Sequence, residues 1–191
     1  MYKNRIEAFS DGVLAIVITI MVLEMKVPHG VSLNTLKPLI PVFLSYVLSF
    51  AYLGIYWNNH HHMLHTAEKV TGPILWANLH LLFWLSLIPF ATGWMGENHF
   101  AAIPTALYGV VLLMAGIAYL VLQKFIILSQ GTESLLKKAI GGDWKGKFSL
   151  TSYLIAVLIA CKFPMVSIGL YVIVAVIWFV PDRRIERNFL N

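Results

Sequence analysis

Residues 5–24 read RIEAFSDGVLAIVITIMVLE, and this stretch decides how the rest of the chain can fold. Charged side chains stand near both ends, and the run between them is apolar apart from small residues and the hydroxyl of Thr19. On a helix with 100° per residue, Asp11 lies on a different face from a narrow, mostly apolar stripe. That stripe carries Gly12, Ile16, Thr19, Ile20 and Leu23. A helix surrounded by lipid has no need of this division, so the sequence predicts a membrane helix with a distinct second face.

The composition of the whole chain excludes a water-soluble domain. Of its 191 residues, 59% are hydrophobic and 12% are charged, and the mean hydropathy is +0.75. So much apolar surface needs lipid as its solvent, and lipid admits only helices or a closed barrel. The apolar runs are too long and too continuous for barrel strands, which predicts an all-α polytopic membrane protein. The first run contains Asp11 and lacks a small-residue cleavage site, so we expect it to remain as a span rather than be removed as a signal.

Breakers containing Pro and Gly divide the chain into six expected transmembrane helices within a single domain that covers residues 1–191. Pro28-His29-Gly30 and Thr71-Gly72-Pro73 are two such breakers. The last two spans are short, because crossing the hydrocarbon takes ~20 residues, and Pro89 is expected to kink the third. The six spans are predicted at about 5–26, 36–66, 73–95, 103–128, 148–162 and 165–180.

The Lys and Arg residues give the expected orientation. If the N-terminus is cytoplasmic, all of the 14 except Lys26, Lys37 and Lys162 fall on the inside. Inside loops of membrane proteins carry such an excess of positive charge. We therefore expect both the N- and C-termini in the cytoplasm and the helices in the inner or plasma membrane of the cell. The net charge of +5 then reflects orientation, and no nucleic-acid partner is expected.

A polar motif, Ser10-Asp11-Gly12, interrupts the first span near its cytoplasmic end. A carboxylate at that depth is costly unless it is paired or hydrated. One interpretation is an interfacial acid that the positive end of the helix dipole favours. The other is a buried cluster in which Ser10 and Asp11 hydrogen-bond a neighbouring helix, with Gly12 allowing that helix to come close. The residues alone leave both interpretations open.

A second polar motif, WNNHHHMLH at residues 57–65, ends the second span on the same side. His61 and His65 are four residues apart, a spacing that can hold zinc. The Cys and acidic residues that would complete a tetrahedral site are too few nearby, so we expect no metal site. The histidines are instead expected to give Asp11 a polar partner, with Trp57 as an interfacial anchor. Catalytic motifs are also lacking, which predicts no catalytic residues, no enzyme activity and no cofactor.

The two polar motifs carry a resemblance to a known family. Arg5-x-x-x-Phe9-Ser10-Asp11-Gly12, followed by Ala15-Ile16-x-Ile18-Thr19, closely resembles the opening of the transmembrane protein 175 family of potassium channels. Trp57-x-x-His60-His61 in the second span and Pro89-Phe90-x-Thr92 in the third are similar to that family as well. The resemblance implies a bacterial, one-copy member whose six-span subunits form a homotetramer in the lipid bilayer, with the four first helices lining the pore.

The resemblance also implies roles for individual residues. Ile16 takes the narrowest apolar ring, Leu23 a second apolar ring and Ile20 a flanking position, while Thr19 supplies a ring of hydroxyls that sets selectivity. A second set matches motif positions that look structural to the pore, namely Arg5, Phe9, Ser10, Asp11, Gly12, Trp57, His60 and His61. The resemblance further implies a leak channel with a modest preference for potassium over sodium, in which K⁺ is the permeant ion. The run of three histidines leaves open which of them meets Asp11.

Other functions remain to be weighed against a channel. The main alternative is a secondary transporter or exporter that moves a small solute or cation by alternating access. Transporters of that class usually show inverted repeats or broken helices with charges at mid-membrane, and the sequence shows neither. A loop that could re-enter as a carbonyl filter is also lacking, so a channel would have to select ions by other means. Ordinary helix packing would explain the stripe on residues 5–24 without any pore.

Overall fold

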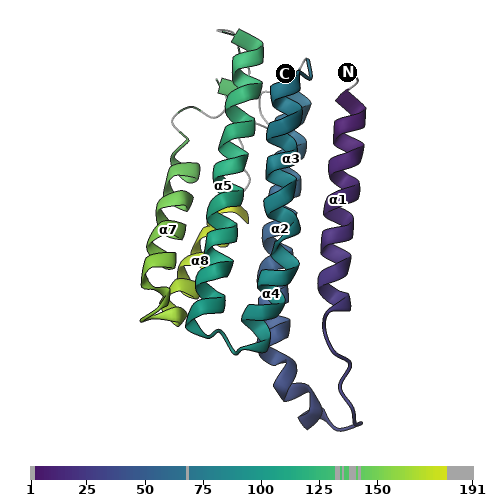
Figure 1. The fold of residues 1–191 in the computed structure, drawn as a ribbon, viewed down its shortest axis with the longest axis vertical. Helices are drawn as coiled ribbons and strands as arrows, with labels where there is room; N and C mark the ends of the chain where they lie inside the picture. The colour runs from purple at the N-terminus through teal and green to yellow at the C-terminus, as the bar shows by residue number, and fades with distance from the viewer. Residues whose placement is uncertain are drawn as a thin grey trace.

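The computed structural model describes residues 3–67, 69–131, 134, 136–137, 141 and 143–179. Within these ranges the chain is all-helical, and its long helices stand side by side as a bundle with α1 at one edge (Figure 1). In chain order the elements are α1 (Lys3–Leu23), the 3₁₀ helix η1 (Leu33–Leu39), α2 (Ile40–Thr66), α3 (Gly72–Ser86), α4 (Ile88–Glu97), α5 (Ala102–Gln130), α7 (Trp144–Ala160) and α8 (Pro164–Phe179).

Four helical stretches are long and apolar enough to cross a membrane, judged by length and composition. They are Lys3–Leu23, Leu33–Thr66, Gly72–Glu97 and Ala102–Gln130, and they correspond to the first four expected spans. The helices α7 and α8 have 17 and 16 residues, short of the ~20 that a straight crossing takes. Six crossings in a single domain therefore stay a prediction, and the expected end of the last span at residue 180 lies outside the described residues.

Several boundaries differ from those that the sequence predicted. The helix α1 ends at Leu23 rather than near residue 26. The second span begins as the 3₁₀ helix η1, which contains Pro38, and becomes α-helical only at Ile40, with Pro41 in the first turn. Proline fits there because the first turn of a helix has no partner for its N–H. η1 and the start of α2 project beyond the corresponding ends of α1 and α4 (Figure 1).

The helix α7, which corresponds to the fifth expected span, starts at Trp144, four residues before the expected start. Asp143 explains this start, because its side chain accepts a hydrogen bond from the backbone N–H of Gly146 at 3.2 Å and so caps the first turn. The backbone of Asp143 is left-handed, with φ at 43°. Asn and Asp tolerate this conformation better than most residues with a side chain.

The third expected span is interrupted at Leu87, where α3 gives way to α4. Pro89 causes the interruption, since it has no N–H to donate to the carbonyl of Leu85 one turn earlier. Helical hydrogen bonding resumes within a few residues. Leu87 N donates to Trp84 O at 3.2 Å, and Ala91 N donates to Leu87 O at 3.1 Å. The predicted kink at Pro89 is therefore a break of one residue between two helices.

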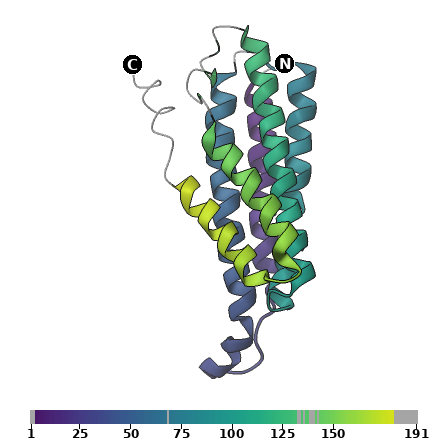
Figure 2. The ribbon, with the colours of Figure 1, turned by 90° about the vertical axis from the view of Figure 1, so that its left-hand side faces the viewer.

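The core lies where α2, α3 and α5 meet the other helices. Leu53, Leu81 and Leu112 are fully buried there. The helices α7 and α8 cover the side of the bundle opposite α1 (Figure 2). Tyrosines join the two sides, because Tyr52 donates to the carbonyl of Tyr171 in α8 at 2.6 Å. These contacts make one continuous core that leaves α1 at the edge.

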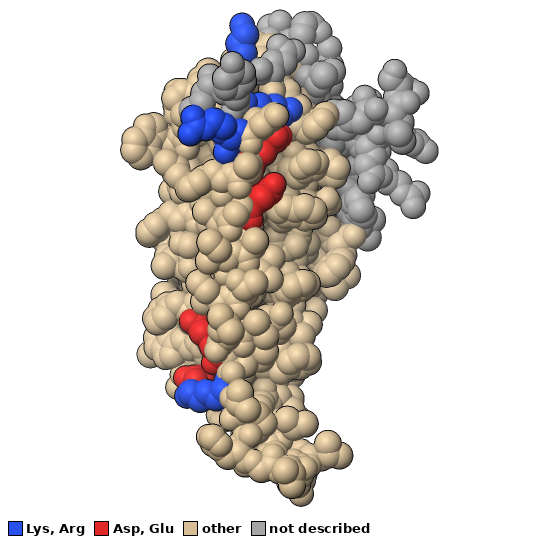
Figure 3. All heavy atoms as spheres, turned by 90° about the vertical axis from the view of Figure 1, so that its right-hand side faces the viewer, with Lys and Arg blue, Asp and Glu red and all other residues tan. Residues whose placement is uncertain are grey.

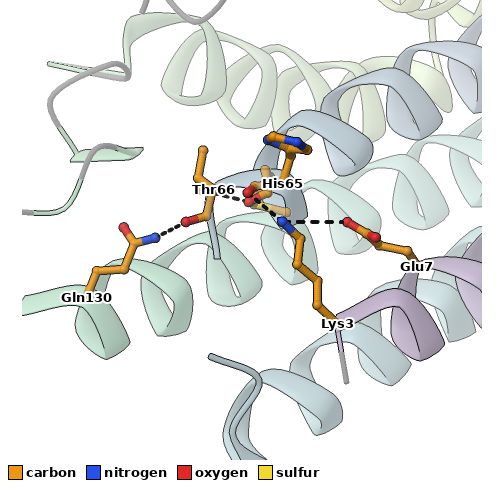
Figure 4. Close-up of polar contacts among 6 residues, drawn as sticks. Lys3, Glu7, His65, Thr66 and Gln130 are labelled. Atoms are coloured by element: carbon orange, nitrogen blue, oxygen red, sulfur yellow. Dashed lines mark hydrogen bonds and ion pairs between the residues drawn. The ribbon is translucent and has the colours of Figure 1, made fainter. Parts of the chain in front are cut away.

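The ends of α1, α2 and α5 are tied together at the last turn of α2 (Figure 4). Lys3 Nζ donates to the carbonyl of His65 at 2.6 Å and lies 4.0 Å from Glu7 Oε1. The amide of Gln130 in α5 donates to the carbonyl of Thr66. The last carbonyls of a helix have no partner within it, and cations are favoured near this negative end. Side chains from two other helices therefore complete the C-terminus of α2.

Candidate functional site

One face of α1 packs against the rest of the bundle. Its buried residues recur every three or four positions, at Ile6, Ser10, Leu14, Val17 and Met21. This face meets α2, α3 and α4. The spacing is that of a helix with one buried stripe, so the opposite side of α1 lies on the surface of the subunit.

The predicted pore stripe lies on that opposite side. Ile16 is 59% exposed and Leu23 is 80% exposed, and Ile20 is exposed as well. Gly12 and Thr19 complete the exposed stripe. A row of large apolar side chains with no cover inside the subunit needs lipid or another protein surface around it. The structure therefore separates a packed face of α1 from an apolar face that lipid or another protein surface has to cover.

The hydroxyl of Thr19 has a defined orientation on this face. Thr19 Oγ1 lies 2.9 Å from the carbonyl of Ile16 and 3.1 Å from the carbonyl of Ala15, both in its own helix. A hydroxyl has one hydrogen and two lone pairs, and a Thr within a helix gives its hydrogen to a carbonyl of the preceding turn. The lone pairs of Thr19 are therefore the part of the group that is left for an ion or for water.

Charged groups lie at the two ends of the α1 side of the bundle and leave an uncharged band between them (Figure 3). Beyond the end of α1, Lys26 Nζ lies 2.8 Å from Glu97 Oε1 at the end of α4. The hydrogen bond with Glu97, and then its charge, raise the pKa of Lys26. Both partners are exposed, so this ion pair marks the boundary of the apolar band more than it stabilises the fold.

Asp11 pairs with a tryptophan of the neighbouring helix. Trp57 Nε1 in α2 donates to Asp11 Oδ1 at 3.0 Å, and its ring stacks on His61 with 6.3 Å between centroids. The expectation that a histidine is the hydrogen-bond partner of Asp11 was wrong, since the indole, expected only as an anchor, makes this bond. The carboxylate stays exposed at the surface of the subunit.

A buried chain of hydrogen bonds links α1, α2 and α3 behind that pair. Ser10, Asn78 and His60 are 0%, 1% and 2% exposed. Ser10 Oγ donates to the carbonyl of Ile6 at 2.8 Å and accepts from Asn78 Nδ2 at 3.0 Å. Asn78 Oδ1 lies 2.7 Å from His60 Nε2, and an amide oxygen only accepts. His60 therefore carries a hydrogen on Nε2 and donates it to Asn78 Oδ1, so the hydrogen bonds run from α1 through α3 to α2.

Sequence reasoning missed Asn78, which joins the other two residues. A signal was available, because Asn78 is an uncharged polar residue inside the apolar run ILWANLHLLFW at residues 74–84. Polar side chains inside membrane helices commonly hydrogen-bond across to other helices. What the sequence lacked was the register of α3 against α1, which decides which polar residues meet.

Three other residues of the predicted structural set do not join these hydrogen bonds. Arg5 and Phe9 are exposed on α1. Gly12 is exposed too, and a Cβ added there would meet none of the described atoms within 4 Å. The expectation that Gly12 permits a close helix approach therefore finds no support within one subunit.

The histidine motif forms a ring cluster at the end of α2. The ring centroids of His61 and His62 are 5.7 Å apart, and those of His61 and His65 are 6.3 Å apart. Across the described ranges, no three His, Cys, Asp or Glu side chains are grouped so that they could hold a metal ion. The expectation of no metal and no cofactor stays a prediction.

Comparison with known proteins identifies the family. The family described as "Endosomal/lysosomal potassium channel TMEM175" matches residues 5–89. A potassium channel of Chryseobacterium sp. (strain P1-3) is 55% identical over 188 residues, which is 98% of each chain. The chain belongs to the TMEM175 family. The resemblance predicted from the motifs of α1 and α2 is thereby confirmed, and a TMEM175 protein is an ion channel, not an enzyme.

Other TMEM175 relatives extend this comparison. The crystal structure of a lysosomal potassium-selective channel TMEM175 homolog from Chamaesiphon minutus superposes with a TM-score of 0.78 at 26% identity, covering 94% of this chain and 97% of that one. The "Endosomal/lysosomal proton channel TMEM175" of Homo sapiens is 35% identical over 101 residues, and this chain spans about one fifth of its length. The chain is therefore a multi-pass membrane protein of a cation-channel family, and a secondary transporter is not favoured.

Proposed function

We propose that four copies of this chain form a potassium-permeable leak channel with a modest preference for K⁺ over Na⁺. The observation that carries the proposal is the exposed stripe on α1, which has large apolar side chains and one hydroxyl and no cover inside the subunit. Four such stripes facing one axis cover one another and leave a channel between them. The potassium channels among the TMEM175 relatives support the choice of permeant ion.

In the proposed pore, Ile16 forms the constriction. Four isoleucine side chains around one axis make a ring that sheds water when it is narrow, and a dewetted ring stops ions without a charged gate. Ile20 flanks this ring, and Leu23 forms a second apolar ring about two turns along the helix from Ile16. A small tilt of the four helices widens both rings and admits water with an ion.

Thr19 supplies the selectivity of this pore. It lies roughly 4.5 Å along the helix axis from Ile16, so four hydroxyl oxygens stand next to the constriction. Their outward lone pairs replace part of the hydration shell of a cation that is squeezed through. Potassium gives up its water more cheaply than sodium, which sets the sign of the preference. The preference is modest because hydroxyls on separate helices form no rigid cage.

The polar groups at the end of the bundle hold α1 in position and conduct nothing. The bonds among Ser10, Asn78 and His60, together with the pair of Asp11 and Trp57, fix the rotation of α1 about its axis. That rotation decides which residues face the pore. Arg5, Phe9, Gly12 and His61 lie on the exposed side of the same end, where neighbouring subunits meet.

The rest of the arrangement completes the proposal. The channel lies in the inner or plasma membrane with both termini in the cytoplasm, so the tie between α1, α2 and α5 is on the inner side. Its partners are the other three copies and the lipid, and K⁺ with other monovalent cations is what it passes. No cofactor takes part.

The test measures K⁺ and Na⁺ flux from purified protein in liposomes. Ile16→Asn puts a polar group in the narrowest ring, and we expect K⁺ flux to rise roughly tenfold, as for a barrier lowered by ~1.4 kcal/mol. Thr19→Ala removes the hydroxyls, and we expect the K⁺ preference to fall. Val22→Asn is the matched control, because Val22 is an exposed residue of α1 outside the stripe. Unchanged flux in Ile16→Asn with unchanged selectivity in Thr19→Ala contradicts the assignment of α1 to the pore.

A further inference from the structure

A cavity of about 260 Å³ lies between α5 and the residue that precedes α7. One face of α5 forms most of its wall, and Asp143, which precedes α7, forms the rest. The helix α7 begins well short of the end of α5 (Figure 1), which places the cavity beside the last turns of α5. The residues from α5 are Leu120, Gln123, Lys124, Ile127 and Leu128.

Gln123 in this wall carries an unpaired acceptor. The residue is 7% exposed, and its Oε1 is buried with no hydrogen-bond donor among the described residues. Nearly all buried side-chain oxygens in proteins have a donor, so each exception needs an explanation. Gln123 also lines the cavity, so a molecule that brings an N–H or O–H there would supply the missing donor once the amide turns its buried oxygen toward the cavity.

The charged groups around the cavity define that molecule further. Asp143 places a carboxylate in the wall, fixed over Gly146 by the hydrogen bond that caps α7. Lys124 places an exposed ammonium on the same wall. A ligand that fits has a cationic N–H donor for Gln123 and Asp143 and an anion for Lys124. A primary ammonium joined to a phosphodiester has both.

The position of the cavity along the membrane normal agrees with a phospholipid as its ligand. From Ala102 to Lys124, α5 spans roughly 33 Å at 1.5 Å per residue, close to the ~30 Å of a hydrocarbon core. Lys124 therefore reaches headgroup level when Ala102 lies at the opposite boundary. Leu128 is 64% exposed and Ile127 is partly exposed, so apolar surface adjoins the polar groups.

We propose that this cavity binds a phospholipid whose headgroup is an ethanolamine phosphate. The ammonium donates to Gln123 Oε1 and to the Asp143 carboxylate, the phosphate pairs with Lys124, and the lipid backbone lies along Leu120 and Ile127. A choline headgroup has no N–H to donate, and a glycerol headgroup brings no cation to Asp143. This site is separate from the proposed pore, and its test does not involve ion flux.

The test compares lipids on the purified, delipidated protein in detergent. Palmitoyl-oleoyl phosphatidylethanolamine is titrated beside the phosphatidylcholine and phosphatidylglycerol of the same chains, with bound lipid counted by native mass spectrometry and Tm followed. We expect the ethanolamine lipid to bind roughly tenfold more tightly than the choline lipid, the factor that one charge-assisted hydrogen bond provides. Gln123→Leu should abolish this preference with its lipid-free Tm unchanged or higher, and Gln123→Glu should retain it.

Two further measurements isolate the site. Lys124→Gln should weaken all three phospholipids, whereas Lys147→Gln, an exposed lysine on α7 outside the cavity wall, should change nothing. The proposal is overturned if the three lipids bind equally to the unaltered protein, or if Gln123→Leu keeps the ethanolamine preference, since either result means annular lipid only. Equal protection by soluble O-phosphoethanolamine would overturn the assignment to a lipid.

Discussion

Asn78 joins three helices through a single side-chain amide. Its nitrogen donates to Ser10 in α1 and its oxygen accepts from His60 in α2, and all three side chains are buried. A buried polar chain of this kind favours the fold only when each member is paired. Removal of this amide therefore leaves the buried His60 N–H without a partner and leaves Ser10 with only its bond to the Ile6 carbonyl.

Asn78→Leu tests this role. The change leaves the His60 N–H unpaired and takes the donor from Ser10, so we expect the free energy of unfolding to fall by roughly 1–3 kcal/mol. Thermal or detergent unfolding of the purified protein measures it. Asn59→Leu is the matched control, because among the described residues the Asn59 amide donates only to Ile55 O in its own helix. An equal fall in the free energy of unfolding in the two variants would mean that the hydrogen bonds of Asn78 to other helices add nothing to stability.

Individual residues also show how far the sequence could lead. The sequence could predict which residues of α1 share a face, because burial follows the period of the helix. Ile16, Ile20 and Leu23 are exposed together, as that period requires. The sequence could also predict a disturbance of the helix at Pro89, because proline has no backbone N–H to donate at any position. The partner of Asp11 could not be predicted, because Trp57 and the histidines share one helix end and only the rotation of α2 decides which side chain reaches the carboxylate.

At the scale of elements, the packing of α2 against α4 depends on a glycine. A Cβ at Gly96 would lie 2.8 Å from the backbone Cα of Val42 and 2.5 Å from Ser45 Oγ. Backbone atoms cannot move aside as the end of a side chain can, so the two helices would have to separate. The sequence alone could not predict this contact, since neither helix contains the information that sets its register against the other.

Gly96→Ala should therefore destabilise the protein by roughly 1–3 kcal/mol, the usual cost of overpacking. The measurement is again thermal unfolding of the purified protein. Gly169→Ala in α8 is the control, because a Cβ there meets none of the described atoms within 4 Å. Replacing a helical glycine by alanine is then expected to be neutral or to stabilise by up to ~1 kcal/mol. A neutral Gly96→Ala would show that α2 and α4 yield more easily than their backbones suggest.

At the scale of the whole molecule, α1 and α7 lie on opposite sides of the bundle. The proposed assembly puts α1 at the centre and α7 at the lipid, which gives the two surfaces different neighbours. The fold class was predictable from composition alone. The number of membrane crossings was harder to predict, because length is the main signal for a crossing in a sequence. The helices α7 and α8 are shorter than the ~20 residues that span the hydrocarbon core.

Cysteine cross-linking tests this arrangement. Cys161 is an exposed free thiol, so the background is Cys161→Ser. In that background, Leu23→Cys should form disulfide-linked dimers on oxidation in the membrane, since it lies in a ring around the proposed axis. Leu158→Cys, at a position that is also strongly exposed but lies on α7, should stay monomeric. Cross-linking through Leu158→Cys but not Leu23→Cys would place α7, rather than α1, between the subunits.

The orientation of the Thr19 hydroxyl has a consequence for ions of the other sign. Its hydrogen is committed to the carbonyls of Ile16 and Ala15, so the stripe has no donor to offer a chloride ion. An anion entering between the four helices would lose water and meet only oxygen lone pairs and hydrocarbon. The proposed pore therefore rejects anions through the direction of one hydroxyl bond, without a single charged residue in its wall.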